Sequence, residues 1–103
     1  MDRIVFKYRV TKNFLTVLFE LPEGPISPMD LRGLEHRVSK ASPNIGVVIS
    51  GRGPIWLYAT LSHIYHPALW VAIFDPRLGG GVVAATHTSS MKVGDIVSTE
   101  GLL

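Results

Sequence analysis

The feature that most constrains the fold is a pair of short apolar runs separated by a segment of helical length. The first run, residues 46–50, leads into a glycine-arginine turn at residues 51–54, and the second, residues 70–74, leads into Asp-Pro-Arg at residues 75–77. Between them, residues 54–66 begin with a proline and have helical spacing of apolar residues. Uninterrupted apolar runs are typical of central strands covered on both faces. A crossover of this length predicts two parallel strands with a right-handed connection.

The direction of these strands predicts where the polar residues lie. Parallel strands end at the same edge of a sheet, and ligands of open α/β sheets bind outside those ends. The glycine-arginine turn and Asp75 should therefore share one edge. His66 follows the helix that runs back, so it should lie at the opposite edge. A strand of about six residues spans roughly 17–20 Å. We therefore expect that His66 and Asp75 of one chain do not meet.

The rest of the chain adds strands and one short helix. Alternating apolar residues, or short apolar runs between turn residues, predict strands. Ser27 followed by proline is typical of a helix start. The predicted strands are residues 3–10, 14–21, 81–86 and 93–97, the first two forming an antiparallel hairpin, and the predicted helix is residues 28–34. No element is predicted for residues 35–44. The sum is an α/β two-layer sandwich, ferredoxin-like, with a mixed sheet of about five strands and two helices.

Composition restricts the class of protein. The chain has 103 residues, which suits one domain spanning residues 1–103, and 47% of them are hydrophobic. Since only 17% are charged, a disordered chain is excluded. So high an apolar share in a small domain predicts a subunit interface. The net charge of +2 favours a small anionic ligand over long nucleic acid, which usually leaves a clustered basic footprint.

Two missing features narrow the class further. The chain has no cysteine, which excludes disulfides, zinc-thiolate sites and cysteine nucleophiles. The N-terminal residues lack the apolar segment of a signal peptide, and no apolar run approaches the length of a membrane span. We therefore expect a cytoplasmic protein with no membrane partner.

The two turns at the predicted shared edge have the chemistry of an anion site. Glycines let backbone N–H groups approach a ligand, a helix start carries partial positive charge, and an arginine adds a full one. Arg77 could hold a phosphate by a bidentate contact. Asp75 could hold a sugar hydroxyl or ligate a metal. The alternatives are a plain strand-to-helix turn and an Asp-Pro turn with a solvated arginine. The candidate ligand-binding residues are Ser50, Gly51, Arg52, Gly53 and Arg77.

The four histidines differ in what their positions indicate. His66 could act in catalysis or could simply interact with the helix C-terminus. His63 lies off the apolar stripe of the helix, so it is expected at the surface or in an interface. His36 and His87 have no partner pattern. No spacing typical of a metal site or of a Ser-His-Asp arrangement is present.

Three segments together resemble the third ring nuclease family of type III CRISPR systems. They are residues 49–57, the pair His66-Pro67 and residues 71–79. The glycine-arginine turn and the Asp-Pro-Arg turn at this spacing carry the resemblance, and Gly94-Asp95 also fits it.

The resemblance implies a metal-stimulated phosphodiesterase, a ferredoxin-like dimer that binds cyclic tetra-adenylate. Such an enzyme cleaves the ring to linear adenylates and switches off antiviral signalling. The family is also described as a Mn²⁺-dependent nuclease acting on RNA 3′ ends. His66 and Asp75 match its key His and Asp, which implies that they are catalytic and are possible ligands of Mn²⁺. Dimers are thought to stack head to tail into tetramers or longer assemblies around the ring, so that His66 of one dimer faces Asp75 of the next.

Three alternatives remain beside the ring nuclease. The same anion-binding edge suits a sensor that binds a cyclic oligoadenylate or another nucleotide without cleaving it. A Mn²⁺-dependent exoribonuclease that removes 3′ adenylates is the second. A purely structural interaction protein would explain the apolar composition but would leave the paired turns unexplained.

Overall fold

A computed structural model of the protein describes residues 2–103, and its centre is a single six-stranded sheet. The strands are β1 (Val5–Val10), β2 (Phe14–Glu20), β3 (Gly46–Gly51), β4 (Trp70–Asp75), β5 (Gly80–Thr86) and β6 (Ile96–Ser98). One α-helix, α1 (Ile55–Ile64), connects β3 to β4, and two short 3₁₀ turns, η1 (Pro28–Leu31) and η2 (Leu34–His36), lie between β2 and β3.

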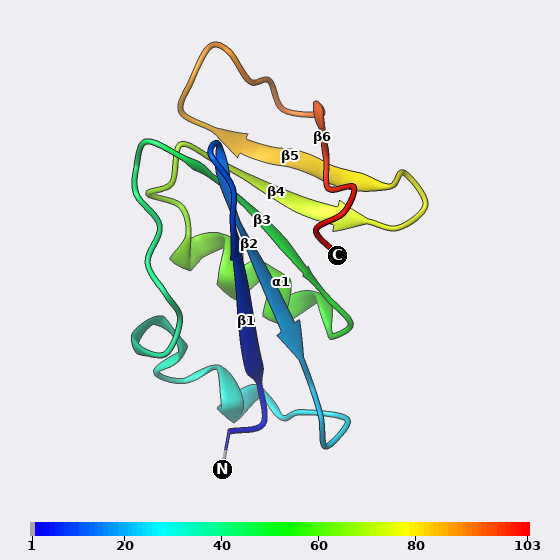
Figure 1. The fold of residues 1–103 in the computed structure, drawn as a ribbon. Coiled ribbons are helices and arrows are strands. Elements are labelled where there is room, and N and C mark those ends of the chain that lie inside the picture. Colours follow the sequence, from blue (N-terminus) through cyan, green and yellow to red (C-terminus); the bar gives the residue numbers. More distant parts are fainter. Residues whose placement is uncertain (1) are drawn as a thin grey trace.

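The strands lie in the sheet in the order in which they occur in the chain (Figure 1). The central strands β2, β3 and β4 are parallel, and the outer pairs β1–β2, β4–β5 and β5–β6 are antiparallel. The predicted hairpin of the first two strands and the predicted parallel pair across α1 are therefore confirmed. The ferredoxin-like prediction is wrong, because in a ferredoxin-like fold another strand lies between the two parallel strands of a βαβ unit. Here β3 and β4 are direct neighbours.

Two other predictions about the elements are corrected. The sheet has six strands rather than about five, and there is one α-helix rather than two. The predicted helix at residues 28–34 is replaced by two 3₁₀ turns, because Gly33 adopts a left-handed conformation with φ of 73° and ends the first turn. The last strand begins at Ile96 because Gly94 and Asp95 form a turn, in which the Lys92 N–H donates to the Asp95 carboxylate.

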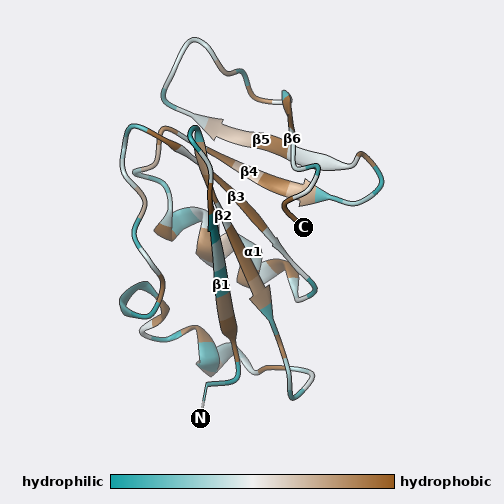
Figure 2. Cartoon of the chain, viewed as in Figure 1, coloured by the Kyte–Doolittle hydropathy of each residue, from teal (hydrophilic) through white to brown (hydrophobic). Residues whose placement is uncertain are grey.

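Side chains on the two faces of the sheet form two apolar clusters. On one face, α1 and the segment after η2 cover the central strands (Figure 1), and Leu57 and Leu61 of α1 are fully buried there. On the other face, Val97 and Leu102 near the C-terminus pack against the cluster that includes Trp70. Figure 2 shows the apolar character concentrated along β3 and β4 and polar residues at the turns. This matches the expectation that the two apolar runs are covered on both faces.

In the part of the chain that the structure describes, no helix has both the length and the apolar character that crossing a membrane requires.

Candidate functional site

The two predicted turns do lie at one edge of the sheet. Ile49 of β3 pairs with Ile73 of β4 in parallel register. Two residues further along each strand, β3 ends at Gly51 and β4 ends at Asp75. In Figure 1 this edge is at the right, where β3 leads into α1 and β4 leads into β5. We call the turn at residues 50–53 together with the turn at residues 75–79 the turn edge.

The glycine turn is shaped by aromatic packing beneath it. A Cβ atom at Gly51 would lie 2.6 Å from the ring of Phe19, and one at Gly53 would lie 2.8 Å from it, closer than real Cβ contacts come. Tyr58 of α1 packs edge-on against Phe19, with ring centroids 5.1 Å apart, and its hydroxyl donates to the Gly51 carbonyl. Burial raises the pKa of Tyr58, so it stays a hydrogen-bond donor. Close approach to Phe19 therefore explains both glycines.

Arg52 stands at this turn as a free cation. Its side chain is exposed, and within residues 2–103 no carboxylate forms an ion pair with it. The turn is followed directly by the first residues of α1, whose N–H groups carry partial positive charge. An anion placed at this corner would therefore meet a guanidinium together with the start of a ten-residue helix.

Asp75 and Arg77 are each other's partners. The Arg77 guanidinium donates to the two Asp75 carboxylate oxygens, at 3.4 Å from Nε and 3.2 Å from Nη2, and the Arg77 backbone N–H donates at 2.9 Å. These hydrogen bonds hold the pKa of Asp75 below its usual value, and they raise that of Arg77. The Asp75 side chain is 24% exposed and that of Arg77 is 87% exposed. Asp75 is therefore an ionised acceptor at neutral pH rather than an acid. Arg77 reaches a phosphate only by exchanging or sharing its carboxylate.

His66 lies at the opposite edge, as predicted from strand direction. Helix α1 runs back from the turn edge and ends at Ile64, two residues before His66, and β4 begins at Trp70. The His66 backbone N–H donates to the His63 carbonyl in the last turn, and its side chain is exposed. Within one chain the whole of β4 separates His66 from Asp75.

The structure places a second histidine beside His66. The His66 and His87 rings meet edge to face with centroids 4.9 Å apart, and Nε2 of His87 is 2.9 Å from the His66 carbonyl oxygen. The sequence alone indicates no partner for His87. The antiparallel pairing of Trp70 with Thr86 was the signal that could have found it, because it brings the residue after β5 next to the residues before β4.

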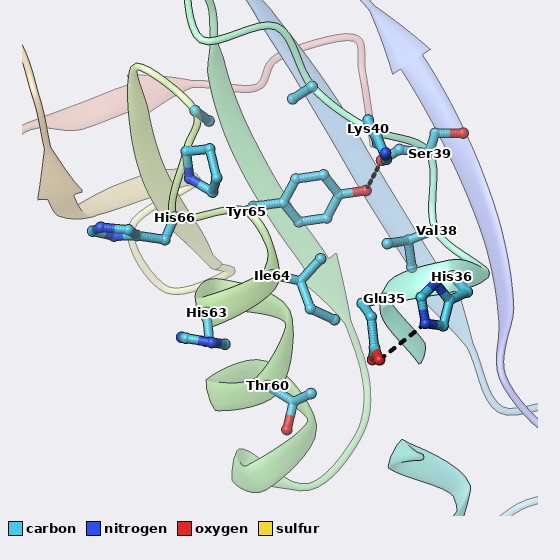
Figure 3. A pocket seen from close by; sticks show the side chains of 13 residues that line it. Glu35, His36, Val38, Ser39, Lys40, Thr60, His63, Ile64, Tyr65 and His66 are labelled. Atoms are coloured by element: carbon cyan, nitrogen blue, oxygen red, sulfur yellow. Dashed lines mark hydrogen bonds and ion pairs between the residues drawn. The ribbon is translucent and has the colours of Figure 1, made fainter. Parts of the chain in front are cut away.

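A cleft of about 910 Å³ lies on the helix side near this edge. Figure 3 shows it between the end of α1 and the segment after η2, with His63 and His66 on the helix side and Lys40 across from them. Tyr65 extends from the end of α1 towards the segment after η2 and donates its hydroxyl to the Ser39 carbonyl at 2.5 Å. Burial, together with the neighbouring Tyr8, raises the pKa of Tyr65, so it remains protonated and structural. The cleft is lined by Glu35, His36, Val38, Ser39, Lys40, Ala41, Thr60, His63, Ile64, Tyr65, His66, Pro67 and Ala68.

The residues implied as metal ligands do not form a site for a shared ion in one chain. Divalent manganese prefers several oxygen or imidazole ligands around one point. No cluster of three His, Asp or Glu side chains occurs within the described range, residues 2–103. Asp75 is occupied by Arg77, and His66 is at the other edge.

Comparison with known proteins places this arrangement in a family. A family model described as CRISPR-associated protein (Cas_csx3) matches residues 19–98, which is more than half of the chain. The chain belongs to this family. The span of the Cas_csx3 match runs from the end of β2 to β6, so it includes the turn edge, His66 and His87. A relative from Aquifex aeolicus (strain VF5), described as an uncharacterized protein, is 41% identical over 95 residues, which cover 90% of this chain and 85% of the relative. The protein is thus CRISPR-associated.

Proposed function

We propose that this Cas_csx3 protein is a ring nuclease, which binds cyclic tetra-adenylate and cleaves it to linear adenylates. The observation that carries the proposal is the separation of two chemically distinct edges in one chain. The turn edge offers cations and hydrogen-bond donors, and the other edge offers two adjacent histidines. Family membership supports a role in CRISPR defence. The ligand and its cleavage rest on the resemblance described above and on the chemistry of these edges.

The turn edge supplies binding in this proposal. Arg52 and the first N–H groups of α1 attract a phosphate of the ring. Arg77 adds a second guanidinium, and its partner Asp75 is an ionised acceptor suited to a ribose hydroxyl. A cyclic tetranucleotide carries four phosphates and four 2′-hydroxyls, so it presents both groups repeatedly to such an edge.

His66 supplies the proton transfer, and it comes from a second molecule. An imidazole near neutral pH can take the proton of an attacking group or give one to a leaving oxygen. Since β4 separates His66 from Asp75 within one chain, a ring bound at the turn edge reaches His66 only if another copy presents its histidine edge. Head-to-tail stacking of dimers satisfies this requirement.

A sensor that binds the ring without cleaving it is the second candidate. The observation that favours it is the Asp75–Arg77 pair, which leaves a single chain with a binding edge but no assembled catalytic group. In the sensor, His66 only completes the end of α1 and needs no second copy.

One experiment separates the two candidates. The protein is incubated with cyclic tetra-adenylate in Mn²⁺ and, in parallel, in EDTA, and linear products are resolved by liquid chromatography and mass spectrometry. In parallel, binding of cyclic tetra-adenylate is measured for the wild type and for the Asp75→Ala variant. Linear product supports the ring nuclease, and tight binding without product supports the sensor. No binding at micromolar protein would refute both. An RNA with a 3′ oligoadenylate end, assayed in the same buffers, tests the exoribonuclease alternative.

A further inference from the structure

The contact between His66 and His87 joins two segments that are distant in sequence. His66 follows α1, and His87 follows the last residue of β5. The His87 backbone N–H donates at 2.8 Å to the carbonyl of Leu69, just before β4. The backbone position of His87 is therefore set by the sheet, because it continues the β4–β5 ladder.

The hydrogen bond between the two histidines has a fixed direction. A carbonyl oxygen can only accept, so Nε2 of His87 carries the proton in its bond to the His66 carbonyl. That carbonyl belongs to the helix end, where backbone acceptors lack helical partners. Pro67 follows directly and restricts the backbone of His66. His66 is thus held at its N–H by His63, at its carbonyl by His87, and on its C-terminal side by proline.

The ring contact restricts the His66 side chain as well. The two rings are tilted by 74° with centroids 4.9 Å apart, so the His87 ring blocks part of the space around the exposed His66 imidazole. An exposed histidine otherwise samples several rotamers and loses entropy when it must adopt one of them. Catalytic groups act best when neighbouring groups fix their orientation in advance.

We propose that His87 is a positioning residue, which fixes the backbone and rotamer of His66 for cleavage of the ring. This inference rests on the proposed function, because it assigns His87 a role in the same reaction. His87 acts through His66 and not on the ligand. It therefore contributes to the rate of the chemical step and not to binding of the ring.

The test compares two substitutions of His87 with a matched control. His87→Leu removes the donor, whereas His87→Gln keeps an amide N–H at a similar distance from the backbone. His36→Gln is the control, since His36 is an exposed histidine whose Nε2 lies 3.4 Å from the carboxylate of neighbouring Glu35. Steady-state cleavage of cyclic tetra-adenylate gives kcat and KM, and thermal unfolding confirms that each variant is folded. Three-bond NMR couplings of His66 report whether its side chain keeps one rotamer.

We expect His87→Leu to lower kcat roughly 10- to 100-fold while KM changes less than about threefold. His87→Gln should recover kcat to within about fivefold of the wild type, and His36→Gln should match the wild type. The His66 couplings should show one rotamer in the wild type and in His87→Gln, and averaging in His87→Leu.

Other outcomes overturn the proposal in distinct ways. A raised KM with unchanged kcat in His87→Leu would make His87 a ligand contact. An equal loss of kcat in His87→Leu and His87→Gln, with the His66 rotamer unchanged, would show that the His87 ring takes part in the reaction directly. If His87→Leu does not fold, the His87→Gln kinetics and couplings still decide, and an averaged His66 rotamer there overturns the proposal. If the wild type cleaves no ring in Mn²⁺ or in EDTA, the proposed function fails instead, and the couplings alone show whether His87 fixes His66.

Discussion

Replacing Gly53 by alanine tests why the turn at residues 50–53 contains this glycine. Gly53 does not have a positive φ, so its backbone conformation is open to alanine. The added Cβ would lie 2.8 Å from Cε1 of Phe19, 3.3 Å from its Cζ and 3.4 Å from Cδ1 of Leu21. Real Cβ contacts are not that short, so the Phe19 ring has to move by several tenths of an ångström.

The ring has little room for this movement. Phe19 is 2% exposed and packs against Tyr58 on its edge. Overpacking of a filled core costs about 1–3 kcal/mol, and the contact at Gly53 is partial, so we expect Gly53→Ala to lower the free energy of unfolding by about 1–2 kcal/mol. In a domain of about 100 residues, this corresponds to a fall in Tm of roughly 5–15 °C.

A double-mutant cycle in urea isolates the contact. Phe19→Leu alone should destabilise by about 1 kcal/mol, because the ring is buried. In the double variant, the smaller side chain makes space for the new methyl group. The double variant should therefore lose about 1 kcal/mol less free energy of unfolding than the sum of the losses in the two single variants. Additivity to within about 0.3 kcal/mol would refute the packing explanation of this glycine.

The same variants separate packing from ligand approach. If the double variant is stable and still binds cyclic tetra-adenylate, packing alone accounts for the glycine. If it is stable but no longer binds, the ligand itself needs the space at Gly53, which supports the prediction that the glycines let a ligand approach the backbone.

Three further predictions test other contacts. Gly46→Ala should destabilise the fold by about 3 kcal/mol or more and should shift tryptophan fluorescence, because the new Cβ would lie 1.9 Å from the Trp70 indole; unchanged fluorescence and stability would contradict the packing described. Arg77→Gln should raise the pKa of Asp75, measured by NMR titration, towards its ordinary value. The pair's contribution to stability is present above that ordinary value and is lost as the pH falls through the lowered one, so in the variant this pH dependence should become weaker, while the backbone N–H of residue 77 still donates to Asp75. Tyr58→Phe should lower the free energy of unfolding by about 1 kcal/mol, because it removes the hydrogen-bond donor to the Gly51 carbonyl at the start of the turn. The variant should also bind cyclic tetra-adenylate more weakly without a lower kcat. An unchanged affinity would show that this hydrogen bond does not shape the site.

The central part of the fold could be predicted from the sequence for a simple physical reason. Central parallel strands have to be apolar on both faces, and few other structures explain two such runs joined by a helix of this length. Strand direction then determines at which edge of the sheet each turn lies, so the separation of Asp75 from His66 follows from the sequence alone.

The details that were missed depend on contacts between distant segments or on local backbone geometry. The order of six strands could not be read from periodicity, which gives strands but not their neighbours. Gly33 divided an expected helix into two turns, because one left-handed residue is enough to end a short helix. The Asp75–Arg77 pair was a missed local signal, since side chains two residues apart in a tight turn can meet.

His87 shows how a contact between distant segments escapes sequence reasoning. Nothing beside it in the chain indicates a partner, and its contact with His66 arises only through the β4–β5 register. Extending the predicted hairpin by one residue beyond Trp70 and Thr86 would have placed His87 opposite Leu69, three residues after His66.

Mixing two inactive variants tests the composite site most directly. His66→Ala lacks the histidine edge, and Asp75→Ala lacks the carboxylate of the turn edge. We predict that each alone cleaves no cyclic tetra-adenylate. In an equimolar mixture, about a quarter of randomly formed head-to-tail contacts would join an intact His66 to an intact Asp75. Recovered cleavage, with a maximum near equal proportions, is the predicted result. No recovery at any ratio, with both variants folded and binding the ring, would contradict a site shared between two molecules.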